Sequence, residues 1–275
     1  MRGHARGRGV DSERGSEGQC SSRQGAVTTP TPPHPVLKEY YSTADKRQGF
    51  VAELFDGCAQ YYNHVGRLLD LGSGPGYRKW AVRRAGLRPG MRLLDVATGT
   101  GLLARGAEQV VGKSGRVIGV DPSRGMLGEA KKALSSSPLV QGRAEALPFR
   151  DDAFDMLTMC FALRHVPDLD VAFGEYCRVL KPGGRALVLE VSTPSSPILR
   201  AMLKTHLQRT MPFLARLTTR SRPAEVLMKF YWDTIEQCVP PETILEALRR
   251  SGFVDVKRRF LWGMMSEYQA SKPLP

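Results

Sequence analysis

Two glycine-rich stretches of the chain have the residue types of a nucleotide-binding turn. The first is LLDLGSGPG, residues 68–76, and the second is RLLDVATGTG, residues 92–101. In each, an aspartate follows aliphatic residues and two glycines stand one residue apart, as where a buried strand runs into a ligand-binding turn. Glycines let the backbone approach a ligand closely, and a helix that opens after the turn offers free N–H groups to a carboxylate or phosphate.

The first stretch is the closer match to the motif. Asp70, Gly72, Gly74 and Gly76 fill a D-x-G-x-G-x-G pattern, whereas the second stretch has Ala97 in the first glycine slot. However, the first stretch follows a helical pattern and the polar sequence YYNHVG, with no earlier strand to lie beside. We therefore interpret it as a turn between N-terminal helices.

The second stretch leads into a succession of strands, so we predict the ligand site there. A helical pattern follows it, and then GRVIGVD, a strand that ends in Asp121, 26 residues beyond Asp95. That separation is close to the roughly 20 residues expected for an acid that receives a ribose. These features predict a nucleoside-containing ligand. A dinucleotide stays open at this point, because GTGLLA at 99–104 also fits G-x-G-x-x-G/A.

From residue 91 the chain alternates between strand-like and helix-like segments. The strand-like runs are 92–97, 115–120, 153–162 and 185–191, and the helix-like runs are 102–111, 125–134 and 171–180. Strands separated by helices of this length predict an α/β fold with a parallel sheet covered on both faces. Ligands of such sheets bind at the carboxyl ends of the strands.

The composition bounds the class of protein. The chain has 275 residues, of which 41% are hydrophobic and 24% charged, as in globular domains. Its five cysteines include no C-x-x-C pair, which argues against a metal site or a disulfide framework and favours a cytoplasmic location. The formal net charge of +13 suits a nucleic acid, an anionic membrane or merely a basic surface.

The first 35 residues differ from the rest of the chain. They are rich in Gly, Ser, Arg and Pro with little to bury, which predicts a disordered tail over residues 1–35. Acidic residues among the arginines disfavour a transit peptide, and no apolar run resembles a secretory signal. No run approaches the roughly 20 apolar residues of a transmembrane helix.

Four further segments carry a family resemblance. They are AEALPF (144–149), DDAFDMLTMCFALRHV (151–166), RVLKPGG (178–184) and LVLEVS (187–192). In order and spacing they resemble the class I S-adenosylmethionine-dependent methyltransferases, and among these the ubiquinone and menaquinone biosynthesis C-methyltransferases. LFDGCAQYYN (54–63) is similar to that family's opening segment, and the resemblance spans roughly residues 40 to 272.

The resemblance implies a Rossmann-like fold with a mostly parallel seven-stranded sheet, helices on both faces and a helical lid insertion. One methyltransferase domain would then cover residues 36–275. Its expected parts are N-terminal helices (36–90), a cofactor-binding core (91–193), a helical lid (194–231) and a C-terminal helix with strands (232–275).

S-adenosyl-L-methionine is the cofactor that the resemblance implies. It places Asp121 on the ribose, Arg143 and Ala144 at the adenine, and Met126 and Cys160 beside the cofactor. The full predicted cofactor-binding set is Asp95, Thr98, Gly99, Thr100, Gly101, Asp121, Pro122, Met126, Arg143, Ala144, Glu145 and Cys160.

Three departures from the family pattern bear on the chemistry. Leu102 stands where the family has an acid, and Arg143 stands where an Asp or Asn caps the adenine amino group, so that contact must come from Glu145 or from backbone. The family's Arg-Asn pair is Arg164-His165 here. These departures leave cofactor binding in place and the substrate open.

Methylation of a ring carbon requires that a phenol or quinol lose a proton so that the carbon becomes nucleophilic. We predict that Arg164 stabilises the phenolate and that His165, whose ordinary pKa is near 6.5, takes the proton. A loop histidine that only satisfies a backbone carbonyl is the alternative.

Residues 194–231 form an insertion that is helical in pattern, apolar on one side and strongly basic. Its basic residues are Arg200, Lys204, Arg209, Arg216, Arg220, Arg222 and Lys229. As a lid it would close over an apolar substrate, and as an amphipathic surface it would rest on anionic lipid. A solvated helix face is the third interpretation. The first two favour a lipophilic substrate and a membrane-peripheral enzyme.

The sequence leaves other function classes open. An O- or N-methyltransferase of a phospholipid or secondary metabolite is the alternative among enzymes, and a non-catalytic cofactor-binding member is another. We predict no nucleic-acid partner, because the chain lacks a basic module interleaved with aromatics and has CFALRHV where a base-flipping loop would stand. A homodimer stays open.

Overall fold

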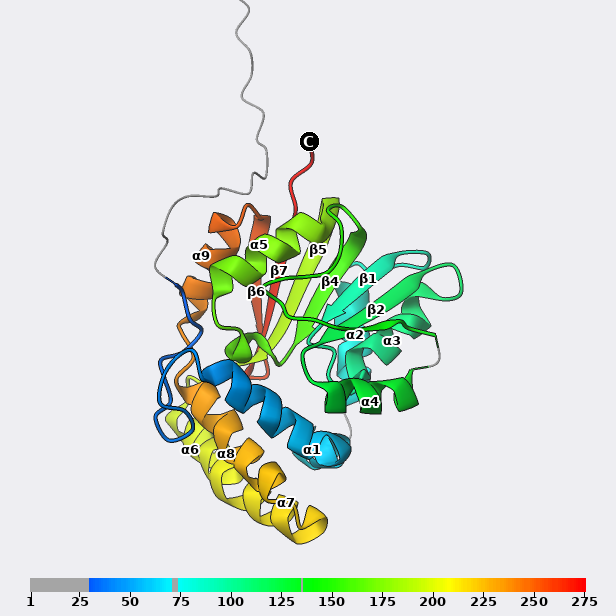
Figure 1. The fold of residues 1–275 in the computed structure, drawn as a ribbon. Coiled ribbons are helices and arrows are strands. Elements are labelled where there is room, and N and C mark those ends of the chain that lie inside the picture. Colours follow the sequence, from blue (N-terminus) through cyan, green and yellow to red (C-terminus); the bar gives the residue numbers. More distant parts are fainter. Residues whose placement is uncertain (1–29, 71–73, 135) are drawn as a thin grey trace, which may run out of the picture.

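A seven-stranded sheet forms the centre of the computed structural model, which describes residues 30–70, 74–134 and 136–275 (Figure 1). The strands are β1 (Arg92–Val96), β2 (Arg116–Asp121), β3 (Leu139–Gln141), β4 (Phe154–Cys160), β5 (Leu180–Val191), β6 (Val254–Leu261) and β7 (Met265–Ser271). Their order in the sheet is β3-β2-β1-β4-β5-β7-β6. β7 runs antiparallel to β5 and β6, and the other neighbours are parallel. The predicted mostly parallel sheet is confirmed.

The central strands are buried on both faces, which explains their near-continuous apolar sequences. Leu93 and Leu94 of β1, for instance, are both fully buried but belong to different core clusters, one on each side of the sheet. All four predicted strands are present. β5 begins at Leu180, five residues before its predicted start, and the three-residue β3 was not predicted because so short a strand has no readable periodicity.

Helices cover both faces of the sheet, as predicted. They are α2 (Gly74–Arg84), α3 (Leu102–Val111), α4 (Arg124–Ala133), α5 (Leu169–Val179) and α9 (Pro241–Arg250). α2 and α3 share one core cluster with the sheet, while α5 and α9 pack together in the other (Figure 1).

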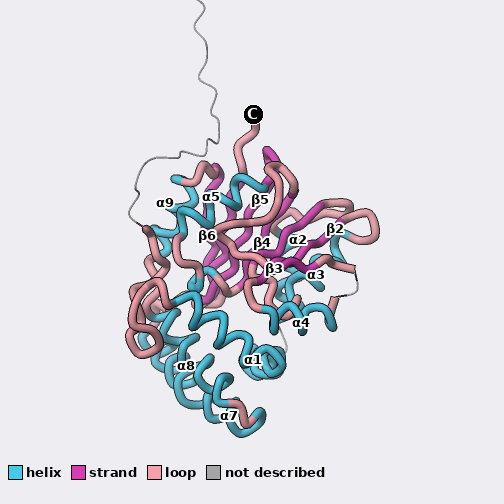
Figure 2. Tube along the Cα trace, in the orientation of Figure 1, coloured by secondary structure: helices cyan, strands magenta, loops and turns pink. Residues whose placement is uncertain are grey.

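A second helical layer lies beyond the sheet (Figure 2). It consists of α1 (Arg47–Asp70), α6 (Pro197–Thr205), a π-helical turn (His206–Thr210), α7 (Met211–Thr219) and α8 (Arg222–Glu236), which share their own apolar core. The insertion at 194–231 is therefore helical, as predicted. Its predicted end at residue 231 lies inside α8, which continues to Glu236 because Trp232 and Ile235 extend the buried face of that helix.

The predicted tail is too long at its C-terminal end. Residues 1–29 lie outside the described residues, but residues 30–35 pack on the domain. The Leu169 amide donates to the Thr31 carbonyl at 3.0 Å and the Val239 amide donates to the Pro33 carbonyl at 2.8 Å. His34 is only 2% exposed. The composition of residues 30–35 shows that they have few apolar side chains to bury. It does not show that the fold provides a buried site for His34.

The first glycine-rich stretch runs from the end of α1 into the start of α2. α1 ends at Asp70 and α2 begins at Gly74, so the N-terminal helices on either side of the predicted turn are confirmed. Residues 71–73, which hold the turn itself, lie outside the described residues.

No helix within residues 30–70, 74–134 and 136–275 is long and apolar enough to cross a membrane. In the same ranges, no group of three or more His, Cys, Asp or Glu side chains could hold a metal ion.

Candidate active site

The loop between β1 and α3 has the backbone shape that its glycines predict. Gly99 and Gly101 take positive φ angles of 56° and 81°, and Ala97 takes 53°, a conformation that is strained for a residue with a Cβ. A Cβ at Gly99 would meet no heavy atom within 4 Å, because Gly99 borders a cavity. A Cβ at Gly101 would lie 3.0 Å from Leu134, so this glycine is needed for packing.

Asp121 ends β2 and shapes this loop. Its Oδ2 accepts a hydrogen bond from the Gly99 amide at 2.8 Å, and its Oδ1 accepts one from the Ser123 amide at 2.9 Å. Burial raises the pKa of Asp121 to about 6, although both hydrogen bonds favour the charged form. The carboxylate also borders the cavity, so it can accept hydrogen bonds from a ligand.

Asp95 and Thr98 lie behind the loop. The Asp95 carboxylate is 1% exposed and accepts from the Thr98 hydroxyl at 2.7 Å and from the Thr158 hydroxyl at 2.8 Å. Burial raises its pKa to about 6. Neither residue borders the cavity, and their hydrogen bond holds the shape of the loop that does.

The cavity has a volume of about 370 Å³ and lies between α1, the glycine loop, the start of α4 and the end of β4. Nine of the predicted site residues border it: Gly99, Asp121, Pro122, Met126, Arg143, Ala144, Glu145, Cys160 and His165. Residues from four separate elements thus meet at the carboxyl ends of neighbouring parallel strands, where such folds bind ligands. Thr100, Gly101 and Arg164 do not border it.

At one end of the cavity, the positive charge of Arg143 is balanced by the negative charge of Glu145. Arg143 Nε and Glu145 Oε2 lie 3.2 Å apart, with the arginine half exposed. Met126 is buried where the cavity meets the core of the helical layer, so its side chain borders both.

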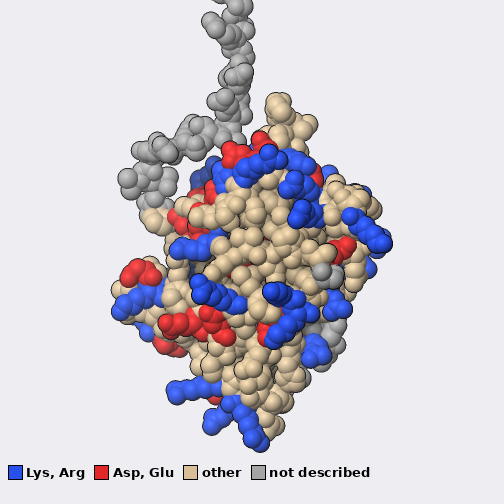
Figure 3. All heavy atoms as spheres, turned by 45° about the vertical axis from the view of Figure 1, so that its right-hand side comes forward, with Lys and Arg blue, Asp and Glu red and all other residues tan. Residues whose placement is uncertain are grey.

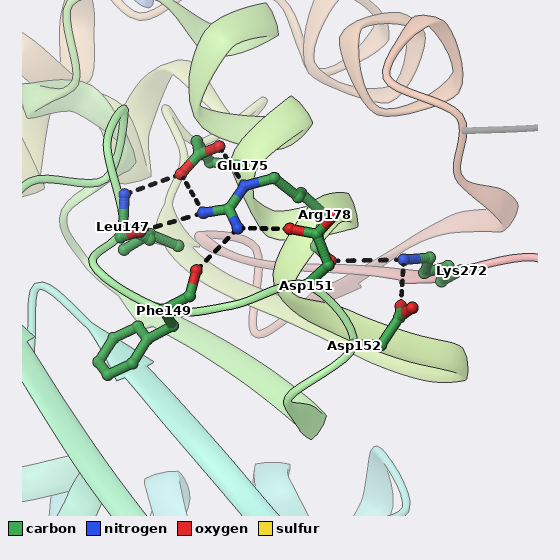
Figure 4. A network of polar contacts seen from close by, with 7 residues as sticks. All are labelled: Leu147, Phe149, Asp151, Asp152, Glu175, Arg178 and Lys272. Atoms are coloured by element: carbon green, nitrogen blue, oxygen red, sulfur yellow. Dashed lines mark hydrogen bonds and ion pairs between the residues drawn. The ribbon is translucent and has the colours of Figure 1, made fainter. Parts of the chain in front are cut away.

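Arg178 holds the loop that follows this end of the cavity (Figure 4). Its guanidinium donates to the carbonyls of Phe149 and Leu147 at 2.7 and 3.0 Å, and pairs with Glu175 and Asp151. The Leu147 amide in turn donates to Glu175 at 2.8 Å. The arginine of RVLKPGG therefore fixes the backbone of AEALPF, which gives a structural reason why both segments occur in this chain.

Helix α1 is tied to the cavity through two residues that the sequence analysis missed. The Thr100 hydroxyl donates to Asn63 Oδ1 at 2.5 Å, so Thr100 faces α1. Asp56 accepts from the Gly125 amide at 2.9 Å and from the Ser123 hydroxyl. Both acceptors belong to LFDGCAQYYN, whose resemblance to the family opening was the available signal.

Arg164 is placed differently from its predicted role. The guanidinium is fully buried and pairs with Glu190 at 2.9 Å. It also donates to the Thr234 hydroxyl at 2.6 Å and to the Tyr231 carbonyl at 3.2 Å. Direct stabilisation of a phenolate by Arg164 does not fit this geometry, because the charge is used to join the end of β5 to α8.

His165 borders the cavity among aromatic rings. Its ring stacks on Phe230 at a centroid distance of 5.5 Å and meets Phe55 edge-on at 5.2 Å. Both ring nitrogens are buried, and neither has a hydrogen-bond partner in the described part of the chain. Burial and the nearby Arg164 charge hold the pKa of His165 well below its usual range, so the imidazole is neutral. It can accept a proton or a hydrogen bond from a ligand.

Comparisons with known proteins identify the family to which this chain belongs. Residues 41–272 match the model of the ubiE/COQ5 methyltransferase family. The chain is 34% identical over 225 residues to the ubiquinone/menaquinone biosynthesis C-methyltransferase UbiE of Francisella tularensis subsp. tularensis, which covers 80% of this chain and 89% of that protein. The UbiE protein of Shewanella halifaxensis is 32% identical over 219 residues, covering 78% and 86%.

Solved structures share the fold at lower identity. A methyltransferase of Thermotoga maritima, described as a possible histamine N-methyltransferase, superposes with a TM-score of 0.55 at 20% identity, covering 80% of this chain and 99% of that one. Phosphoethanolamine N-methyltransferase 2 of Haemonchus contortus, in complex with S-adenosyl-L-methionine, gives 0.52 at 19% identity, covering 72% and 52%. The chain therefore belongs to the ubiE/COQ5 methyltransferase family, whose members are S-adenosylmethionine-dependent enzymes.

Proposed function

We propose that the protein transfers a methyl group from S-adenosylmethionine to a ring carbon of a lipophilic quinol or phenol, such as a demethyl-quinone precursor. The names of its relatives support this reaction, since they are ubiquinone and menaquinone biosynthesis C-methyltransferases. One observation in the structure carries it: a cavity with a nucleoside-type carboxylate, Asp121, also presents an unpartnered neutral imidazole, His165, among aromatic rings.

The residues around the cavity fit this cofactor. Asp121 keeps lone pairs for the ribose hydroxyls, and the open space at the Gly99 Cβ position leaves room for the ligand beside the loop. Arg143, Glu145 and Met126 border the part of the cavity that would receive the adenine. When bound, S-adenosylmethionine supplies an electrophilic sulfonium methyl, so the protein mainly aligns the two partners and excludes water.

His165 would prepare the acceptor. Phe55 and Phe230 flank it with apolar surface suited to a quinol ring, and a phenol hydroxyl could donate to the free imidazole nitrogen. Removal of that proton makes the ring carbon nucleophilic. Arg164 would then be a positioning residue, since it is adjacent to His165 and fixes this loop to β5 and α8.

A membrane contact through residues 194–231 would give access to such an acceptor. Ile198, Met202, Phe213 and Leu217 are 65–75% exposed along α6 and α7. Lys and Arg side chains lie at the lower end of the molecule, where α7 lies, beside a largely uncharged surface (Figures 1 and 3). Apolar side chains flanked by cations suit an anionic bilayer surface. We propose a cytoplasmic enzyme that rests on the membrane through this face.

The test of the reaction is methyl transfer from isotopically labelled S-adenosylmethionine into a lipid extract, read by mass spectrometry. Label on a ring carbon of a quinol-type product is the expected result. Label on an oxygen or on a phospholipid head group would instead support the O- or N-methyltransferase alternative.

A substitution at His165 tests its part in the proposal. We expect His165→Phe, which keeps an aromatic ring between Phe55 and Phe230, to lower kcat about 100-fold or more with unchanged cofactor affinity, since general-base steps contribute roughly that much. Undiminished kcat in this variant would refute the base role of His165.

A further inference from the structure

A second hollow, here called the α2 hollow, lies on the exposed side of α2. It has a volume of about 560 Å³, and the described residues that border it are all different from those of the proposed cofactor cavity. Its lining consists of Gly76, Lys79, Trp80, Arg83, Arg84 and Arg88. Four of these six residues are Lys or Arg and none of the six is Asp or Glu, so the hollow attracts anions.

Most of this positive charge is not neutralised by the part of the chain that the structure describes. Of the four cations, only Arg84 has an acidic partner among the described residues, the buried Glu267. Lys79 Nζ donates to the neutral amide oxygen of Gln109 at 2.7 Å, and Arg88 donates to two backbone carbonyls at 3.2 and 3.3 Å. Three cations of the lining are therefore available to an anion from outside the chain.

Stabilisation of the helix end explains only part of this arrangement. Arg83 and Arg84 lie in the last turn of α2, where cations interact favourably with the helix dipole. Lys79 lies one turn earlier, however, and Arg88 lies beyond the end of the helix. Lys79 and Arg83 are also four residues apart, a spacing at which like charges on a helix repel each other. An anion bound in the hollow would relieve this repulsion.

Aromatic side chains lie beside these cations. The Arg84 Cζ is 3.5 Å from the centroid of the Trp80 ring, yet Trp80 remains 47% exposed. Tyr77 connects Trp80 to Trp262, with ring-centroid distances of 6.3 and 5.2 Å. Trp262 lies in the turn between β6 and β7 and is 66% exposed. An exposed indole with an apolar body and a polar N–H suits the interfacial layer of a bilayer, where tryptophan is enriched.

The β6–β7 turn joins this region to the exposed face of residues 194–231. A Cβ at Gly263 of the turn would lie 3.4 Å from Leu199 Cδ2 of α6, and the neighbouring Ile198 is 75% exposed. The apolar face of α6 and the α2 hollow thus flank the same turn. An extended partner such as a bilayer surface can contact both, whereas a small soluble anion would contact the hollow alone.

We propose that the α2 hollow binds the phosphate of an anionic phospholipid at a bilayer surface, with Trp80 and Trp262 in the interfacial layer. The planar guanidinium groups of Arg83 and Arg88 can give a phosphate paired charge-assisted hydrogen bonds. The proposal rests on the membrane contact proposed for residues 194–231 and adds to it a headgroup site on a different element.

Cosedimentation of the full chain with lipid vesicles tests this proposal. The vesicles are phosphatidylcholine alone, or phosphatidylcholine mixed with phosphatidylglycerol, and we expect the wild type to prefer the mixed vesicles. Arg83→Gln/Arg88→Gln should bind the mixed vesicles about 30-fold more weakly, since each cation near an anionic surface contributes roughly fivefold. Unchanged binding of this double variant would overturn the proposal.

Arg150→Gln/Arg249→Gln is the matched control. It removes the same net charge at two exposed positions that do not line the hollow, so it should bind the mixed vesicles like the wild type. Equal losses in the two double variants would also overturn the proposal, because the overall charge of the protein would then set its binding.

Tryptophan emission shows whether this region meets the lipid. The chain has three tryptophans, of which Trp232 is fully buried, so a change on binding reports on Trp80 and Trp262. We expect the mixed vesicles to shift the emission of the wild type to shorter wavelength, and the shift to be smaller in Trp80→Phe and in Trp262→Phe. A full shift in both variants would contradict the proposal.

Ile198→Ser/Met202→Ser in α6 separates the two membrane contacts. If it weakens vesicle binding while Arg83→Gln/Arg88→Gln does not, only the proposal for the α2 hollow fails. If the reverse holds, the hollow binds lipid and the contact through residues 194–231 fails.

Calorimetric titration with inorganic pyrophosphate and with a single-stranded oligonucleotide tests soluble anions. If either binds the wild type but not Arg83→Gln/Arg88→Gln, and the mixed vesicles do not bind, the hollow takes a soluble anion and the lipid assignment is wrong. None of these measurements requires a methyl acceptor, so they do not depend on the proposed reaction.

Discussion

At the scale of single residues, Asp121 shows how one carboxylate serves two purposes. It accepts backbone hydrogen bonds from Gly99 and Ser123, which set the loop, and it borders the cavity. The backbone hydrogen bonds stabilise the charged carboxylate, but burial destabilises it more and raises its pKa to about 6. The carboxylate is thus charged at neutral pH but becomes protonated when the pH falls below about 6.

We therefore expect the affinity for S-adenosylhomocysteine to fall as the pH drops below about 6. The protonated carboxyl loses acceptor capacity for the ribose hydroxyls, so the dissociation constant should rise by up to about tenfold per pH unit. Titration calorimetry between pH 5 and 8 measures this change. Asp121→Asn, which has no such titration, should bind weakly and with a flatter pH profile. A wild-type affinity that is constant across this range would contradict the assignment.

At the scale of elements, α1 closes the cavity from the side opposite the sheet. Phe55 and Tyr62 of this helix border the cavity, while Asn63 and Asp56 bind the glycine loop and the start of α4. These hydrogen bonds connect the glycine loop and the start of α4 to α1, which lies dozens of residues earlier in the chain. We therefore expect α1 to take part in cofactor release.

We expect Asn63→Ala to speed cofactor release. Loss of the hydrogen bond to Thr100 removes roughly 1 kcal/mol, which corresponds to about a fivefold faster dissociation rate if α1 opens first. Stopped-flow displacement of a bound fluorescent cofactor analogue gives the rate. Gln60→Ala, at an exposed position of the same helix, is the control and should leave it unchanged. A normal rate in Asn63→Ala would show that α1 does not gate release.

At the scale of the whole molecule, the segment before α1 joins distant parts of the fold. His34 Nε2 accepts from Arg47 at 2.5 Å and its Nδ1 donates to the Pro35 carbonyl at 2.7 Å. Arg47 also donates to the Val166 carbonyl, directly after His165. Burial, followed by the charge of Arg47, lowers the pKa of His34 to about 4.

This histidine makes stability depend on pH. Between about pH 6.5 and 4 the unfolded chain takes up a proton at His34 and the folded chain does not, so folding loses up to roughly 3 kcal/mol as the pH falls. Asp95 and Asp121 act in the opposite direction, because their raised pKa values let the folded chain take up protons first.

The contribution of His34 is isolated by comparison with His34→Gln, which retains a hydrogen-bond acceptor for Arg47. We expect the melting temperature of the wild type to fall more than that of the variant between pH 7.5 and 5, as measured by calorimetry. Removal of residues 1–35 should lower the melting temperature at pH 7.5 relative to removal of residues 1–29. Parallel pH profiles in wild type and His34→Gln would contradict the role assigned to this residue.

Much of the architecture could be predicted from local sequence. The alternation of apolar strands with helical segments predicted the sheet, its parallel core and the helices on both faces, because period and length are properties of short windows. The choice of the second glycine-rich stretch followed from the strands around it. Short or irregular elements such as β3 escaped, since three residues do not define a period.

The order and spacing of the motifs were enough to predict the family, the fold and the residue types that meet at the strand ends. The contacts of these residues are visible only in the folded chain: Asp95 lies behind the loop, Thr100 binds Asn63 of α1, and Arg164 pairs with Glu190. Glu190 is 26 residues from Arg164, and Asn63 is 37 residues from Thr100. At such separations the sequence offers several possible partners for each polar group. A buried polar group forms its hydrogen bond with the partner that packing brings within about 3 Å. The separation of two residues in the sequence does not predict that distance.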